Sequence, residues 1–383
     1  MEHHQTIVIG AGPAGLAAAA CLTQRGCPFL LLEQSNEIGS SWRRHYDRLH
    51  LHTTRGQSHL PGLPLSPELP QYVPRAEVVA YLDRYVAHYG IEPRFGVRVA
   101  RVVRSGDRWI VTTEANTYGA DNVVVGTGFN RRPRIPSWPG EEGFGGPIRH
   151  SVEYRNGADL AGQRVLVVGM GNTGAEVALD LYEHGAQPSI SVRGPVNIVP
   201  RDILGRPTAK TALMLKRLPP RIADPIGTLL QRLTVGDLTR FGIRTPQLPP
   251  LAQLRELGQT PVIDVGTVRL IKRGLIGVLP AISEFLVDTI RFADGSEHPF
   301  DHVVLATGYD SAVTDFVPEA AGMLNRHGHP AGLWGSGQHE GLYFIGFDGY
   351  STGGVLQSIR LEAPQIADRI SRGQSGHGPV TGM

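Results

Sequence analysis

The chain has 383 residues, of which 41% are hydrophobic and 19% charged, and its formal net charge is +2. A chain of this length exceeds the size at which one hydrophobic core stops growing, so we expect two domains of an ordinary globular protein. The composition excludes three classes: no apolar run is long enough to span a bilayer, the arginines form no dense basic patch for nucleic acid, and the two cysteines, Cys21 and Cys27, match neither a disulfide framework nor a metal or CxxC site.

The first element is a strand, a glycine turn and a helix, spelled "TIVIGAGPAGLAAAACLTQRG" over residues 6–26. Gly10 permits the tight turn, Gly12 lets the backbone approach a pyrophosphate, and Gly15 lets the helix pack on the strand. Glu33 ends the next strand, where its carboxylate can accept hydrogen bonds from a ribose 2′-hydroxyl. This pattern suits FAD; the alternative is that Glu33 is a solvated charge at a strand end. The strand begins directly after "MEHHQ", so we expect no signal sequence and a cytoplasmic protein.

A long segment without periodicity follows over residues 38–74, and loops of that length are commonly functional. A helix is predicted over residues 76–90, because apolar residues recur at helical spacing before Gly90. Short strands come next. The phrase "NVVVGTGFN" at residues 122–130 then returns as "HVVLATGYD" at residues 302–310. The repetition indicates that the chain leaves the first domain and later re-enters it.

A second strand, glycine turn and helix lie between those two phrases, spelled "RVLVVGMGNTGAEVALDLYEHG" over residues 164–185. Gly169, Gly171 and Gly174 stand at the same offsets as the first set. Here the residue at the end of the next strand is Arg193, which cannot accept a hydrogen bond from a ribose hydroxyl but can donate to a 2′-phosphate. This turn therefore suits NADPH; a solvated arginine is the alternative.

The expected fold is α/β, with two Rossmann-like dinucleotide-binding domains and the NADPH domain inserted into the FAD domain. Residues 1–148 and 303–383 would form the FAD domain, and residues 149–302 the NADPH domain. Within the insert, residues 200–261 are rich in proline, arginine and leucine, which predicts short amphipathic helices. A plain helical layer is favoured there over a substrate cap or a membrane-surface segment.

A fingerprint precedes the second glycine turn: "FGGPIRHSVEY" fits FxGxxxHxxxY at Phe144, Gly146, His150 and Tyr154. This motif, together with two ordered glycine turns, resembles the flavin-containing monooxygenase family. The phrases "YDRLHLH", "FGGPIRH" and "VPRDILG" are most similar to its YUCCA-type branch, the indole-3-pyruvate monooxygenases. The resemblance covers nearly the whole chain, and it specifies the family rather than the substrate.

The resemblance implies a set of cofactor contacts. Flavin contacts are expected at Gly10, Gly12, Pro13, Ala14, Gly15, Glu33, Gln34, Gly39, Trp42 and Asp348; NADPH contacts at Gly169, Gly171, Asn172, Thr173, Gly174 and Arg193; and Thr127, Gly128, Thr307 and Gly308 would border the cleft. His52 aligns where many members carry an active-site Asn, and it is the candidate catalytic residue in the substrate and flavin pocket. His150 is expected to hydrogen-bond the linker rather than to transfer protons. No metal site is expected.

The leading hypothesis is an NADPH-dependent FAD monooxygenase that inserts one oxygen atom of dioxygen into a small organic substrate through a hydroperoxyflavin. The substrate stays open among 2-oxo acids such as indole-3-pyruvate, other carbonyls, and nitrogen or sulfur nucleophiles. The alternatives are a flavin NADPH reductase that passes electrons to a carrier or to dioxygen, and a non-catalytic sensor. No nucleic acid or membrane span is expected, and the oligomeric state is left open.

Overall fold

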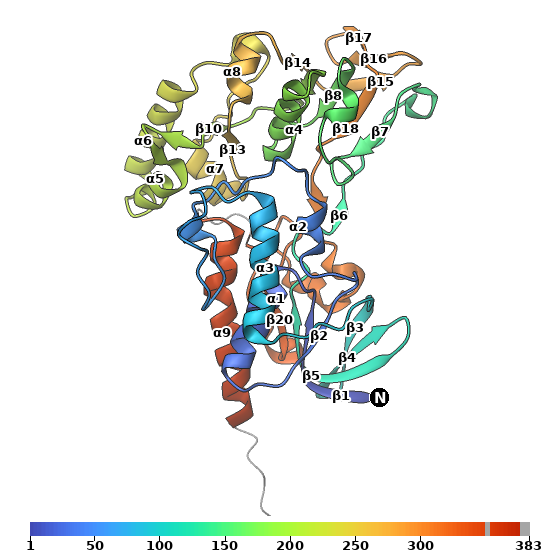
Figure 1. Cartoon of the computed structure of the whole chain (residues 1–383), viewed down its shortest axis with the longest axis vertical. Coiled ribbons are helices and arrows are strands. Elements are labelled where there is room, and N and C mark those ends of the chain that lie inside the picture. The colour runs from blue at the N-terminus through green and yellow to red at the C-terminus, as the bar shows by residue number, and fades with distance from the viewer. Residues whose placement is uncertain (349–352, 376–383) are drawn as a thin grey trace, which may run out of the picture. The chain divides into compact units, whose positions relative to one another are not determined.

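The computed structural model describes residues 1–348 and 353–375 of the chain (Figure 1). The chain divides into two compact units. The first comprises Met1–Arg43, Thr54–Arg132 and Tyr309–Met383, and the second comprises Arg44–Thr53 and Pro133–Gly308. Each unit contains a sheet with parallel strands and helices, mixed in the first unit and wholly parallel in the second, which confirms the predicted α/β fold.

The sheet of the first unit is built around strand β5 (Thr117–Val125), which is long enough to pair with three others. It runs parallel to β1 (Glu2–Ile9), with Val8 opposite Val124, and parallel to β20 (Leu342–Phe344). The sheet is completed by β2 (Leu30–Leu32), parallel to β1, and by the antiparallel strands β3 (Val99–Ser105) and β4 (Arg108–Thr113).

Three long helices belong to the first unit: α1 (Pro13–Gln24), α3 (Arg75–Tyr89) and α9 (Val355–Ser375). Helix α1 buries every residue from Pro13 to Leu22, because its alanine-rich sequence allows close approach on all sides. The α1 helix packs against both α9 and α3 (Figure 1). A short helix, α2 (Ser40–Arg44), lies at the end of the unit's first segment.

The sheet of the second unit is entirely parallel, in the order β14-β9-β8-β18-β7. Its strands are β7 (Ile148–His150), β8 (Arg164–Val168), β9 (Gln187–Ser191), β14 (Gly277–Leu279) and β18 (His302–Leu305). Helix α4 (Asn172–Glu183) connects β8 to β9 and packs against α8 (Thr267–Lys272). A separate antiparallel sheet contains β15 (Ile282–Phe285), β16 (Thr289–Phe292) and β17 (Glu297–Pro299).

The proline-rich stretch of the second unit forms three helices, α5 (Thr208–Leu215), α6 (Pro220–Thr234) and α7 (Pro250–Leu257). Helices α6 and α7 each begin with a proline, at a position where the missing backbone N–H costs no hydrogen bond within the helix. The same region holds the short strands β10 (Ile198–Pro200), β11 (Asp202–Ile203), β12 (Arg206–Pro207) and β13 (Val262–Asp264). In the described ranges, no helix is long and apolar enough to cross a membrane.

Three stretches that the sequence analysis placed with the first domain group with the second unit in the structure: residues 44–53, 133–148 and 303–308. The last two do so because they contain β7 and most of β18, which pair with each other in the sheet of the second unit. The first of them contains Tyr46, a buried member of the second unit's core. The long loop predicted over residues 38–74 is therefore shared between the units.

Candidate functional site

The first glycine turn joins β1 to α1, and its geometry explains why each glycine is needed. Gly10 has φ +100°, and a Cβ there would stand 2.9 Å from the Gly126 carbonyl oxygen. A Cβ on Gly15 would stand 1.7 Å from the Gly10 oxygen. By contrast, a Cβ on Gly12 would meet no atom of the described residues within 4 Å. The protein's own packing thus excludes side chains at Gly10 and Gly15, whereas the open space over Gly12 is where a pyrophosphate would approach.

Glu33, which directly follows β2, stabilises this turn by hydrogen bonds. Its Oε2 accepts a hydrogen bond from the Ala11 N–H at 2.6 Å, and its Oε1 accepts from the Ser35 N–H at 2.9 Å. The Gly39 N–H in turn donates to the Ala11 carbonyl at 2.9 Å. Each carboxylate oxygen has two lone pairs, so buried Glu33 can hold the turn and still accept from a ribose hydroxyl.

Two more residues predicted at the cofactor sites, Thr127 and Asp348, lie in the same unit as this turn, together with Gly346, which the sequence did not single out. Thr127 follows β5, and its Oγ1 is buried with no hydrogen-bond partner in residues 1–348 and 353–375. Gly346 has φ +77°, and a Cβ there would stand 2.8 Å from the Ala14 Cβ, so this backbone lies against the start of α1. Asp348, two residues later, is exposed and accepts from the Ser358 hydroxyl at 3.3 Å. An unsatisfied hydroxyl and an exposed carboxylate near one turn suit a polar ligand.

The other predicted flavin contacts belong to the first unit as well. Gly128 has φ +71° with open space around it, Gln34 is exposed and Trp42 in α2 is half-buried. Pro13 is the first residue of α1 and sits in a helix terminus without a side-chain cap. The free N–H groups there, together with the helix dipole, favour an anion such as a pyrophosphate.

The second glycine turn repeats this geometry between β8 and α4. Gly169 has φ +109°, and its Cβ would stand 2.8 Å from the Ala306 oxygen; a Cβ on Gly174 would stand 1.9 Å from the Gly169 oxygen. Gly171 again has nothing within 4 Å. The α4 N-terminus likewise carries no side-chain cap. The two turns therefore fit the same kind of ligand, one in each unit.

The residues around the second turn differ from those around the first. The Asn172 side chain accepts from the Ile263 N–H at 2.7 Å, which ties the start of α4 to β13, and Thr173 is half-buried beside it. Thr307 donates to the Arg134 carbonyl, so unlike Thr127 its hydroxyl is satisfied. Arg193 is exposed just beyond β9 and makes no side-chain hydrogen bond or ion pair with any described residue. A free guanidinium at this position suits a phosphate.

His150 in the fingerprint has a structural environment. It is buried, its Nδ1 accepts from the Val152 N–H at 3.2 Å, and its Nε2 lies 3.2 Å from the Gly308 carbonyl oxygen. Because Nδ1 accepts, the proton resides on Nε2 and is donated to Gly308. Burial lowers the pKa of His150 below its ordinary 6.5, since desolvation disfavours the charged ring. These contacts are those expected of a linker-holding residue.

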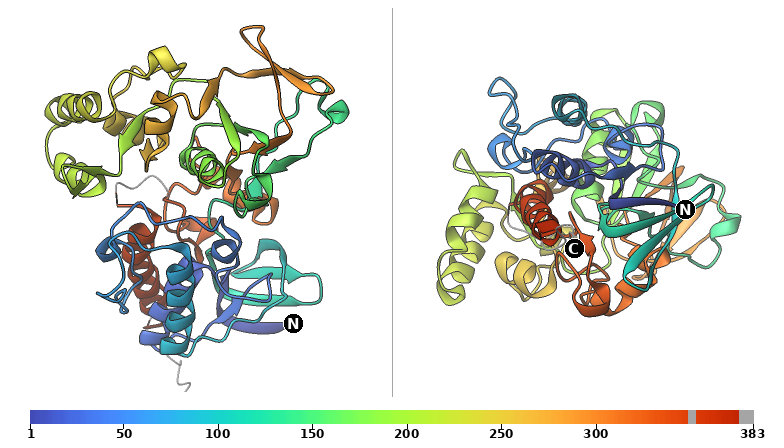
Figure 2. Two further views of the ribbon diagram at one scale, coloured as in Figure 1. Left: turned by 45° about the horizontal axis from the view of Figure 1, so that its top comes forward. Right: turned by 90° about the horizontal axis from the view of Figure 1, so that it is seen from below.

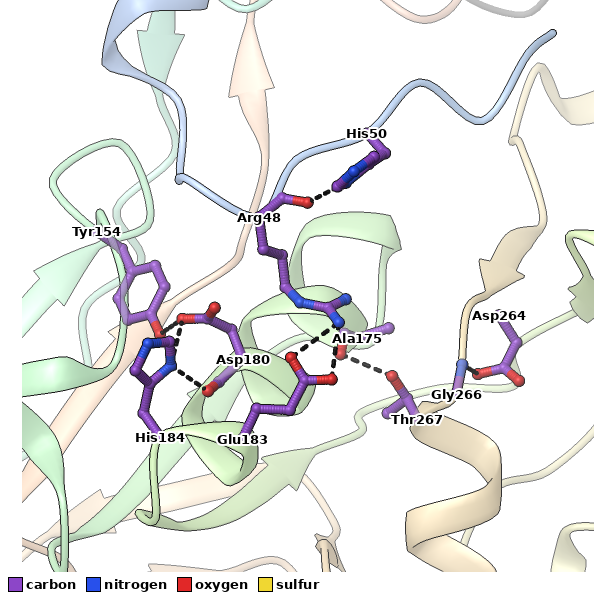
Figure 3. A network of polar contacts seen from close by, with 10 residues as sticks. All are labelled: Arg48, His50, Tyr154, Ala175, Asp180, Glu183, His184, Asp264, Gly266 and Thr267. Carbon is purple, nitrogen blue, oxygen red and sulfur yellow. Dashed lines mark hydrogen bonds and ion pairs between the residues drawn. The ribbon is translucent and has the colours of Figure 1, made fainter. Parts of the chain in front are cut away.

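The other fingerprint residues also have packing or hydrogen-bonding roles. Phe144 packs edge-on against Phe285, with ring centroids 5.3 Å apart, and a Cβ on Gly146 would stand 2.4 Å from the Asp301 oxygen. The Tyr154 hydroxyl donates to Asp180 Oδ2 at 2.6 Å, as Figure 3 shows. The Gly157 N–H donates to the same oxygen at 2.9 Å. Tyr154 therefore fixes the end of the motif to helix α4, whereas Phe144 and Gly146 pack against other parts of the second unit.

The 44–53 segment, in which His52 lies, is held on helix α4 by charged contacts. Arg48 contacts both oxygens of Glu183 on α4 at 2.9 Å, as Figure 3 shows. Asp47 pairs with Arg155, outside α4, at 3.1 Å. His52 Nε2 lies 3.0 Å from the buried Glu176 Oε1, which is an ion-pair distance without hydrogen-bond geometry, because that oxygen accepts no hydrogen bond from residues 1–348 and 353–375. His52 is thus part of the second unit, whereas Trp42, predicted to share its pocket, is part of the first.

Glu176 and Asp180 are the residues that the sequence analysis missed. Both carboxylates are buried on α4, four positions apart on one face of an otherwise apolar helix. Buried carboxylates need partners, and here the partners come from the fingerprint and from the 44–53 segment. Their spacing in "GAEVALDL" was the available signal.

The comparisons with known proteins agree with this geometry. Residues 7–202 match the family described as pyridine nucleotide-disulphide oxidoreductase. The chain is 41% identical over 351 residues to the indole-3-pyruvate monooxygenase YUCCA1 of Oryza sativa subsp. japonica, covering 89% of this chain and 86% of that protein. It is 38% identical to the probable indole-3-pyruvate monooxygenase YUCCA1 of Arabidopsis thaliana, covering 96% and 90%. The chain belongs to the YUCCA family of flavin-dependent monooxygenases.

Solved structures share the fold of the enzyme. The flavin-containing monooxygenase of Stenotrophomonas maltophilia has a TM-score of 0.74 at 21% identity and covers 98% of this chain and 100% of its own. A steroid monooxygenase bound to NADP has a TM-score of 0.77 at 19% identity, covering 98% and 86%. At these identities the likeness concerns the fold alone.

Family membership establishes an NADPH-dependent monooxygenase that uses FAD, as the two different strand-end residues predicted. The reductase alternative is not favoured. A disulfide reductase would also need reactive thiols. Cys21 and Cys27 are free but buried, and burial raises the pKa of Cys21 to about 11. A thiol that stays protonated at neutral pH is a poor redox nucleophile.

Proposed function

We propose that the enzyme oxidatively decarboxylates a 2-oxo acid, with indole-3-pyruvate as the substrate to test first. The identity of 41% over most of the chain to a protein named indole-3-pyruvate monooxygenase carries this proposal. The reaction would consume one dioxygen, one NADPH and one proton, and would yield a carboxylic acid one carbon shorter, carbon dioxide, water and NADP⁺. When bound, reduced FAD supplies the activation of dioxygen and delivers one of its oxygen atoms.

The two dinucleotides would be bound separately. The first turn, with Glu33 as ribose acceptor, would hold FAD, and the second turn, with Arg193 as phosphate donor, would hold NADPH. Support comes from the open space over Gly12 and Gly171, which side chains leave free, and from the uncapped N-termini of α1 and α4.

His52 is the candidate substrate contact. Its Nε2 lies beside Glu176, while its Nδ1 is buried with no hydrogen-bond partner in the described part of the chain. A buried ring nitrogen without a partner is costly unless a ligand satisfies it. The Glu176 carboxylate beside Nε2 would orient the ring, and Nδ1 would be the atom left to bind the substrate.

The test is a product analysis with the FAD-loaded enzyme, NADPH and air. The panel includes indole-3-pyruvate, phenylpyruvate, pyruvate, cyclohexanone, a tertiary amine and a thioether. We expect the shortened acid from the aromatic 2-oxo acids in amounts that match NADPH consumption. Oxidation of only the ketone, amine or thioether would overturn the substrate assignment, and peroxide formation with every compound would favour an oxidase.

A further inference from the structure

Most surface helices bury their large apolar residues, whereas helix α6 exposes them. Its inward face carries Ala223, Gly227 and Gln231, and at Gly227 a Cβ would meet Leu251 of α7 at 3.6 Å. Its apolar residues point outward: Ile222, Ile226, Leu229 and Leu233 are 46%, 37%, 57% and 74% exposed. These four positions fall on one narrow stripe of a helix. The stripe is therefore an apolar surface that the described structure leaves uncovered.

Neighbouring residues extend this surface. Met214 and Leu218, in and after helix α5, are 65% and 42% exposed. Figures 1 and 2 show α5 and α6 together at an outer edge of the second unit. Because apolar patches of this kind are uncommon on monomers, the edge formed by α5 and α6 calls for a binding partner.

Charge indicates what that partner is. Residues 200–244 contain nine Lys or Arg and three Asp, an excess of six positive charges, whereas the whole chain carries +2. Lys216, Arg217, Arg221 and Arg232 are exposed, and none makes a side-chain hydrogen bond or ion pair within residues 1–348 and 353–375. The one acidic residue of α6, Asp224, is already paired with Arg255 at 2.9 Å. Arg221 and Arg232 flank the apolar stripe on the helix surface.

We propose that the α5–α6 edge binds the surface of an anionic lipid bilayer, with the apolar stripe of α6 in the headgroup boundary and the flanking cations at the lipid phosphates. A helix with an apolar stripe, a basic flank and low mean hydropathy lies in the membrane interface rather than across it. A second copy of the chain fits less well, because a symmetric contact would place one cluster of unpaired cations against the other.

Vesicle flotation of the full, FAD-loaded chain tests the proposal. We expect binding to phosphatidylcholine vesicles that contain phosphatidylglycerol, weak binding to phosphatidylcholine alone, and a loss of binding as salt rises. The double variant Leu229→Ser/Leu233→Ser should bind about tenfold more weakly. The matched control is Leu361→Ser, because Leu361 on α9 has the same exposed fraction as Leu229.

The electrostatic part is tested separately. Arg217→Gln and Arg221→Gln should each weaken binding about fivefold, since each cation near an anionic surface contributes about 1 kcal/mol. Arg101→Gln on β3 is the control, an exposed arginine of the other unit. Flavin content and thermal unfolding of each variant establish that it is folded.

Three results would overturn the proposal. They are the absence of binding to anionic vesicles, binding that the α6 variants leave unchanged, and a dimer in light scattering that Leu229→Ser/Leu233→Ser dissociates. The last result would assign the stripe to a second copy instead.

Discussion

His52 Nε2 lies 3.0 Å from Glu176 Oε1, and this contact joins the 44–53 segment to the helix that starts at the second glycine turn. The Glu176 carboxylate is buried, so it depends on this partner more than a surface carboxylate would. The residue predicted to contact substrate is thus oriented by the element predicted to hold NADPH.

Replacing His52 tests this relationship. His52→Ala leaves the Glu176 carboxylate without its partner, which we expect to lower the free energy of unfolding by about 1–3 kcal/mol. It should also divert NADPH oxidation from product to hydrogen peroxide, because the ring no longer lines the substrate site. Product and peroxide per NADPH are measured together.

The matched variants are His52→Asn and Glu176→Gln. Asn keeps a hydrogen-bond donor, so His52→Asn should retain more product per NADPH than His52→Ala. Glu176→Gln keeps the shape but removes the charge, and should fall between His52→Ala and the wild type. Equal product-to-peroxide ratios in all three variants and the wild type would exclude a role for His52 at the substrate site.

The two glycine turns allow a paired test. A Cβ at Gly12 or Gly171 would meet no atom of the described residues within 4 Å, so we expect Val at either position to leave the fold intact. Gly12→Val should lose the flavin spectrum, because Val fills the space of the FAD pyrophosphate. Gly171→Val should keep bound flavin but lose flavin reduction by NADPH in stopped flow. Retention of flavin by folded Gly12→Val would refute the assignment of the first turn.

Arg193 is predicted to select NADPH over NADH. A charge-assisted hydrogen bond to the 2′-phosphate contributes about 1.5–3 kcal/mol, so Arg193→Ala should reduce the NADPH preference by roughly tenfold to a hundredfold. Arg273→Ala, an exposed arginine after α8, serves as the control. Unchanged selectivity in Arg193→Ala would show that another residue binds the phosphate.

The buried His150 should make the folded protein less stable in acid. Burial holds its pKa below the ordinary 6.5, so as pH falls below 6.5 the unfolded chain takes up this proton before the folded chain does. The free energy of unfolding should therefore decrease as pH is lowered below 6.5, and His150→Gln, which keeps a donor for Gly308, should make that decrease shallower. Part of the decrease should remain in His150→Gln, because burial also lowers the pKa of His302. The measurement is the urea midpoint against pH, and an unchanged slope would contradict this account.

The repeated glycine turns, and the fold they belong to, could be predicted because their spacing is local in sequence. Gly15 and Gly174 are required by backbone contacts within one strand, turn and helix, whereas Gly10 and Gly169 also approach Gly126 and Ala306, which lie far along the chain. The partners of the 44–53 segment could not be predicted, because Tyr46 packs in a core whose other members come from far along the chain. The sequence predicts amphipathic helices in the region of α6, but periodicity does not show which face of a helix is covered by the rest of the protein.

We expect one oxygen atom of dioxygen to enter the 2-oxo acid at the expense of one NADPH. The direct measurement is a turnover of indole-3-pyruvate under isotopically heavy dioxygen, with mass analysis of the acid and with carbon dioxide and NADPH consumption measured together. We predict one heavy oxygen atom in each molecule of shortened acid, and equal amounts of acid, carbon dioxide and oxidised NADPH. Acid that carries only solvent oxygen, or NADPH oxidation matched by peroxide with no labelled acid, would contradict the account.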